Sequence, residues 1–144
     1  MKIYNSLIYL LLTTALISCT KTVITSPLQF QRQLLAGNGK FQNTEHTWQL
    51  DSTRINGVIY VLTNDQKNYK KTFTFDGGYK DSDKVSGTWE ITTLNVLKQT
   101  VVYNATKTQD STFYDIASLS SVQLNLTKKL SNGQTVSYSF KISN

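Results

Sequence analysis

The alternation of apolar and polar residues that decides the fold is clearest at residues 84–92, which read KVSGTWEIT. In an extended chain, Val85, Trp89 and Ile91 fall on one face together with Gly87, and polar residues fall on the other. Successive side chains of a strand point to opposite faces, so this period of two predicts a half-buried β-strand. Trp89 is then expected in the core.

The same period recurs in the last third of the chain. Residues 122–130 read VQLNLTKKL, and residues 135–142 read TVSYSFKI. Their predicted inward residues are Val122, Leu124, Leu126, Leu130, Val136, Tyr138, Phe140 and Ile142. Between the two stretches, Asn132-Gly133 is typical of a type I′ turn and predicts a hairpin.

Five further strands are predicted from stretches rich in Thr, Val, Tyr and Phe. They cover residues 47–51, 55–62, 69–75, 97–103 and 112–119. Turn-forming residues follow two of them, at Asn64-Asp65 and at Asp76-Gly77-Gly78. No long helical stretch separates the strands, so parallel crossovers are excluded and the sheet is expected to be antiparallel.

The predicted fold class is therefore all-β, an antiparallel up-and-down barrel of about eight strands. A two-sheet β-sandwich is the alternative, although hairpins between consecutive strands favour the barrel. One short N-terminal helix is also predicted, with Ser26 as N-cap, Pro27 at the first position and Gln29 in capping-box register. Gly37 is expected to end it.

Residues 1–18 have the order of an export signal, in which Lys2 and a short apolar run are followed by a small residue before Cys19. Residues 16–19, LISC, resemble the lipobox of bacterial lipoproteins. That resemblance implies that residues 1–18 are removed and that Cys19 carries acyl chains such as palmitate. Cys19 is also the sole cysteine, so it has no internal disulfide partner.

The predicted organisation is a signal peptide at residues 1–18, a lipidated tether at 19–25 and one barrel domain at 26–144. Acyl chains would anchor this domain to a membrane that the chain does not span. Thr20 stands where lipoproteins retained in the inner membrane have Asp, which indicates the outer membrane. No acidic cluster follows the cysteine, which favours the periplasmic face over the cell surface.

The net charge of +6 does not indicate a nucleic-acid partner. The Lys and Arg residues are scattered along the chain, whereas nucleic-acid sites gather them on one face. Solubility and mild attraction to anionic lipid or glycan surfaces explain the charge better.

No enzyme chemistry is predicted, and no cofactor or metal. His46 is the sole histidine, it follows Glu45 at the start of a predicted strand where exposure is expected, and no nucleophile turn accompanies it. The loop with Asp76, Asp81 and Asp83 does not have the spacing of a calcium site, so a solvated hairpin loop is expected there.

Aromatic residues provide the candidate binding or core positions. They are Trp48, Phe73, Phe75, Trp89, Phe113, Tyr138 and Phe140. These rings could line a cavity for an apolar molecule or stack on a glycan, or they could fill the barrel as core. Tyr60 and Tyr114 fall out of phase and are expected on the exterior.

Several of these motifs occur in an order that resembles the lipocalin-like domains of small bacterial lipoproteins. A Trp opens the first strand in TWQL at residues 47–50, an Asp-Gly turn follows the Phe-rich strand in KTFTFDGGY at 71–79, and Gly-x-Trp comes next in SGTWEI at 86–91. The resemblance covers residues 34–143 and implies a barrel that binds a small ligand.

Two functions are therefore expected from different classes. The first is a lipid-anchored module that binds a small apolar molecule or glycan in the barrel. The second is an accessory lipoprotein with a filled barrel that docks on an envelope protein complex. An open cavity of a few hundred Å³ would favour binding, and a packed interior with an exposed apolar patch would favour docking.

Overall fold

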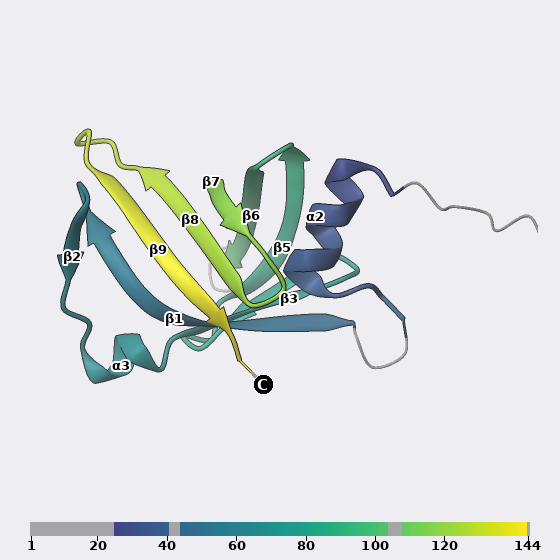
Figure 1. Ribbon diagram of the computed structural model, residues 1–144, viewed down its shortest axis with the longest axis horizontal. Helices are drawn as coiled ribbons and strands as arrows, with labels where there is room; N and C mark the ends of the chain where they lie inside the picture. Colours follow the sequence, from purple (N-terminus) through teal and green to yellow (C-terminus); the bar gives the residue numbers. More distant parts are fainter. Residues whose placement is uncertain (1–24, 41–43, 104–107, 144) are drawn as a thin grey trace, which may run out of the picture.

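The computed structural model describes residues 25–40, 44–103 and 108–143, which form nine strands and two short helices (Figure 1). Cys19, the predicted signal peptide and most of the tether lie outside these residues. The helices are α2 (Pro27–Ala36) and α3 (Asn64–Lys67). The strands are β1 (Glu45–Ile55), β2 (Val58–Tyr60), β3 (Lys70–Thr74), β4 (Gly78–Asp81), β5 (Ser86–Thr93), β6 (Val96–Tyr103), β7 (Thr108–Leu119), β8 (Gln123–Lys129) and β9 (Thr135–Ile142).

Eight of these strands close into an antiparallel barrel. Strands β3 to β8 each pair with the next strand along the chain, β1 pairs with β3, and the β1–β9 ladder completes the ring. Strand β2 is an extra strand on the far half of β1. The predicted up-and-down barrel is confirmed, and the sandwich alternative is not adopted. Every barrel strand finds both neighbours within residues 45–142, so we expect residues 25–144 to fold without the preceding segment.

The predicted N-terminal helix is α2. Ser26 caps it, with its hydroxyl accepting the backbone N–H of Gln29 at 3.2 Å, and Pro27 begins the helix. Gly37, at φ 87°, ends it in a backbone conformation that favours glycine. The helix packs against β1, β3, β5 and β7, whereas β2 and α3 lie at the other end of the molecule (Figure 1).

The turns differ in detail from the prediction. The predicted strand at residues 55–62 is interrupted by Asn56-Gly57, whose positive φ angles of 51° and 83° make the type I′ pair between β1 and β2. The β8–β9 hairpin is confirmed, but among its turn residues only Gly133 has positive φ, and its N–H donates to Leu130 O at 3.0 Å. The type I′ assignment at Asn132-Gly133 was therefore wrong.

Two segments predicted as turn or loop have regular structure. Residues 78–81 form β4, because hydrogen bonds to β3 and β5 give this short segment two partners. At Asn64-Asp65 the chain forms α3 in place of a turn. A capping box holds it: Thr63 Oγ1 accepts the N–H of Gln66, and the Gln66 side chain accepts the N–H of Thr63 at 2.9 Å.

Register shifts change which residues face inward. The β1–β9 ladder shifts between Leu50 and Ser52, so that Thr53, in place of Ser52, is the next buried residue of β1. A second shift lies between Ile116 and Ser118 in the β7–β8 ladder. Strict alternation cannot be carried across either shift, because one extra residue exchanges the two faces.

Candidate functional site

The two ends of the barrel differ in how they are filled. At the end covered by α2, Leu35, Trp48 and Phe73 are fully buried. The indole N–H of Trp48 donates to Leu35 O at 2.8 Å, and His46 Nδ1 donates to Leu34 O at 2.9 Å. These bonds fasten the end of α2 to β1. This end, named here the closed end, is a packed core.

Trp89 also belongs to the closed end. Its indole N–H donates to Thr74 O at 2.9 Å, and its ring packs edge-on against Phe73 at 5.8 Å between centroids. Arg32 from α2 places its guanidinium 5.5 Å from the Trp89 ring centre. Trp89 is 4% exposed and is therefore part of the core.

The other predicted aromatic residues are divided between core, pocket and surface. Phe140 is buried, Tyr138 and Phe75 are half-buried, and Phe113 is 55% exposed. The inward placement of Phe113 was wrong. Strict alternation counted back from Leu119 predicts that Phe113 faces the interior. Because the ladder shifts between Ile116 and Ser118, Tyr114 and Ile116 face the interior instead. The exterior placement of Tyr114 fails for the same reason.

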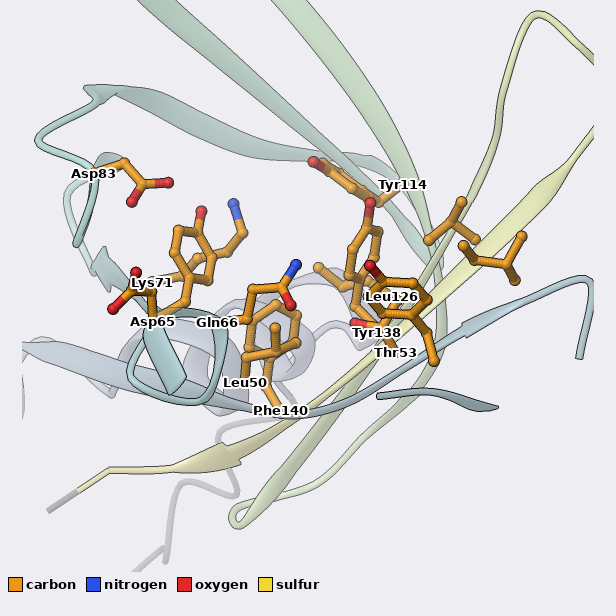
Figure 2. Close-up of a pocket in the computed structure, with 14 residues that line it drawn as sticks. Leu50, Thr53, Asp65, Gln66, Lys71, Asp83, Tyr114, Leu126, Tyr138 and Phe140 are labelled. Carbon is orange, nitrogen blue, oxygen red and sulfur yellow. The ribbon is translucent and has the colours of Figure 1, made fainter. Parts of the chain in front are cut away.

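A pocket of about 570 Å³ occupies the end of the barrel opposite α2, named here the open end. Its walls bring together side chains from β1, β2, β3, β7, β8 and β9 (Figure 2). The apolar lining residues are Leu50, Ile55, Leu126, Val136 and Phe140, and four tyrosines join them: Tyr60, Tyr69, Tyr114 and Tyr138. The pocket is thus mainly apolar, with phenol groups distributed around it.

Polar residues of the pocket lie at its rim and on one wall. Asp65 and Gln66 come from α3, Asp83 comes from the turn between β4 and β5, and all three are exposed. Lys71 projects from β3 into the space beside them (Figure 2). It is 8% exposed, so the open end contains a buried cation close to an apolar cavity.

Lys71 makes few strong contacts for a buried charge. Its Nζ donates to the hydroxyl of Tyr79 at 2.7 Å and, at 3.4 Å, to Oε1 of Gln99. It also lies 4.8 Å from the centre of the Tyr79 ring and 5.4 Å from that of Tyr69, where the ring faces attract a cation. Burial lowers the pKa of Lys71 to about 8, although the nearby carboxylate of Asp81 acts in the opposite direction.

Asp81 is the acid with the largest electrostatic effect on Lys71, and both of its carboxylate oxygens already accept hydrogen bonds. Oδ2 accepts the hydroxyls of Tyr69 at 2.9 Å and Tyr79 at 2.6 Å, while Oδ1 accepts the backbone N–H groups of Asp83 and Val85, each at 3.1 Å. Burial, the largest cause, and this carboxylate raise the pKa values of both tyrosines far above their usual range. Both phenols are therefore neutral hydrogen-bond donors.

The polar part of the pocket was missed from the sequence. Lys71 shares the inward phase of Phe73, and Gln99 shares that of Leu97, which is fully buried. A charged or amide residue in the apolar phase of a strand was the available signal. The aromatic residues predicted to line a binding cavity include neither Lys71 nor Gln99.

His46 and the acidic loop, the groups considered for catalysis and for calcium, both make structural contacts. His46 is half-buried and bonded to α2, in contrast to the exposure predicted for it. No group of three His, Cys, Asp or Glu residues in the described part of the chain is arranged to hold a metal ion. The acidic loop considered for calcium instead uses Asp81 for the tyrosines and for its own backbone.

The fold and this pocket define a small antiparallel β-barrel that is packed at one end and hollow at the other. A scan against protein-family models finds no match for the chain, and a search of curated proteins finds no significant match. Within the described ranges, no helix has the length and apolar character needed to cross a membrane.

Proposed function

We propose that this protein is a binding or carrier module that holds a small apolar molecule in the open end of its barrel. The observation that carries the proposal is the pocket of about 570 Å³, which is lined by residues of six strands. Its volume is within the usual range for small-molecule sites, about 300–1,000 Å³. The dominant aliphatic and aromatic lining would favour an apolar occupant.

An apolar molecule fits this pocket better than a glycan. Sugar rings stack best on broad, accessible aromatic faces such as tryptophan. Trp48 and Trp89 are 0% and 4% exposed in the closed end, so neither can offer a face to the pocket. The glycan alternative therefore lacks its strongest recognition element.

The anchoring of this module is part of the proposal. The LISC sequence at residues 16–19 and the short apolar run before it support removal of residues 1–18 and acylation of Cys19. Two or more acyl chains would hold the barrel at a bilayer. Thr20 after the cysteine supports the outer membrane, and the lack of an acidic cluster in the residues that follow supports its periplasmic face.

Docking on an envelope protein is a second candidate function, because one observation favours it. Val58, Ile59, Tyr60 and Val61 are consecutive and are 71%, 64%, 47% and 83% exposed. They lie on and beside β2, which pairs with β1 over only three residues. An exposed apolar edge strand is a common place for another protein to bind.

Mass spectrometry of the protein from its own envelope tests this proposal. We expect the denatured full chain to be heavier than residues 19–144 by its acyl groups, and Cys19→Ala to lack this mass. We also expect residues 25–144, purified without detergent, to retain a small guest that leaves on denaturation.

Two substitutions at adjacent positions test whether this guest, the bound small molecule, occupies the pocket. Ile55→Trp adds bulk at a residue that lines the pocket, whereas Arg54→Trp adds the same bulk outside the pocket. The guest should be lost only in Ile55→Trp. A guest-free wild-type domain would contradict the binding function and favour docking.

A further inference from the structure

The interior of the open end contains donor groups that the protein does not use. A lysine ammonium has three N–H donors, and the contacts of Lys71 with Tyr79 and Gln99 account for two of them. No carboxylate of the described residues lies within ion-pair distance of Lys71, since the three ion pairs found there involve Lys80, Lys98 and Lys141. Lys71 therefore has a donor and a positive charge available on the pocket wall.

Gln99 supplies a second unused donor next to Lys71. Its side chain is 3% exposed, and its Nε2 has no hydrogen-bond partner among the described residues. Exchanging the amide oxygen and nitrogen would not help, because Nε2 would then face the ammonium, donor against donor. A buried polar atom without a partner is rare and costs about 1–3 kcal/mol of stability. An unpaired Gln99 Nε2 therefore points to a ligand that supplies the missing acceptor.

Lys71 lies on the wall of this mainly apolar pocket, and Gln99 lies behind it, with Oε1 3.4 Å from Lys71 Nζ. Lys71 lines the pocket directly, and Leu50, Leu126 and Phe140 form the apolar surface (Figure 2). An occupant that uses both features must have an apolar body and an anionic acceptor at one end. Such an anion would pair with Lys71 in a weakly hydrated site, where charge-assisted hydrogen bonds are strongest.

We infer that the ligand is an apolar monocarboxylic acid, whose carboxylate accepts hydrogen bonds from Lys71 Nζ and Gln99 Nε2 while its hydrocarbon part fills the open end. This inference rests on the proposed binding function and names its ligand class. A carboxylate has two oxygens, one for each donor. Its single negative charge balances the charge of Lys71. A phosphate dianion would have a second negative charge, which Asp81 and Asp83 would repel.

Titration of residues 25–144 with decanoate, decanol and decyl phosphate at neutral pH tests the inference. Decanoate should bind about tenfold or more tightly than decanol, because an ionic hydrogen bond contributes more than a neutral one. Lys71→Met should weaken decanoate by about tenfold to hundredfold and leave decanol within about twofold. Gln99→Leu should weaken decanoate by a smaller factor.

Lys70→Met is the matched control, since Lys70 is the preceding residue of β3 and does not line the pocket. It should leave all three affinities unchanged, and thermal unfolding should show that each variant is folded. If Lys71→Met does not fold, Gln99→Leu and the decanoate-to-decanol ratio of the wild type decide the question.

The outcomes separate this inference from the proposed function. Equal binding of decanoate and decanol would overturn the carboxylate assignment and leave the apolar pocket in place. Tighter binding of decyl phosphate would overturn the choice of a carboxylate as the head group. An equal loss of decanoate binding in Lys70→Met would attribute the effect to surface charge and overturn the role of Lys71. Absence of binding by all three compounds would overturn the inference and the proposed function together.

Discussion

The closed and open ends of this barrel use similar residue types for different purposes. In the closed end, Trp48 and Trp89 are buried and each indole N–H has a backbone carbonyl partner. In the open end, Tyr138 is only half-buried, Lys71 has no ion pair within the described ranges, and Gln99 keeps an unpaired amide nitrogen. Complete packing at one end is therefore combined with incomplete packing at the other.

This difference suits the proposed function, in which the closed end provides stability and the open end binds the ligand. A site that must accept a ligand contains groups whose hydrogen bonds are incomplete without it, which lowers the stability of the free protein. The helix-covered core can compensate, because large buried side chains contribute most of the hydrophobic stabilisation. We therefore expect substitutions at the closed end to change stability and those at the open end to change binding.

The largest expected effect is at the closed end. Trp89→Ala should lower the free energy of unfolding by about 3–5 kcal/mol, since it removes a buried ring and leaves a cavity. The matched control is Phe113→Ala, which should cost less than about 1 kcal/mol because that ring is 55% exposed. Denaturant unfolding of both variants measures the difference, and similar losses would contradict the assignment of the two rings.

A smaller effect is expected from pH at the open end. Lys71 has a folded-state pKa of about 8, below its usual 10.5, so between these values the unfolded chain binds more protons than the folded one. Stability should therefore rise with pH in this window, by about 2 kcal/mol between pH 8 and pH 10. The groups around Lys71 that enter this balance are Asp81, Asp83, Tyr69, Tyr79 and Tyr114.

The tyrosines limit this rise. The folded-state pKa of Tyr69 lies above the usual value of 10.0, so above that pH the unfolded chain loses protons first and stability falls. Burial also raises the pKa of Tyr114 to about 12, which acts in the same direction. Urea unfolding across this range should show the rise in the wild type and not in Lys71→Met. A rise of equal size in the variant would show that other groups cause it.

Much of the fold could be predicted because its local signals agree. The alternation at residues 84–92 and 135–142, and the cap at Ser26, required no information from the rest of the chain. Strand β4 was missed because its four residues are held by ladders to β3 and β5, and a short segment of turn-forming residues does not reveal such partners.

The pocket was less predictable, because its residues come together only through closure of the barrel. Lys71 and Gln99 are far apart in sequence and meet inside the ring of strands. Tyr114 was placed on the wrong face because a register shift in the β7–β8 ladder reverses the alternation. An unusual polar residue in an apolar phase can be seen in a sequence, but the residue that it contacts cannot.

An NMR titration of residues 25–144 with decanol, which has no charge, tests most directly whether the open end binds an apolar ligand while the closed end stays packed. Amide signals of Leu126, Tyr138 and Phe140 should shift together, while the indole N–H signals of Trp48 and Trp89 should stay in place. Shifts at the two indoles, or shifts confined to the exposed β2 residues Val58 and Ile59, would contradict a ligand site in the open end.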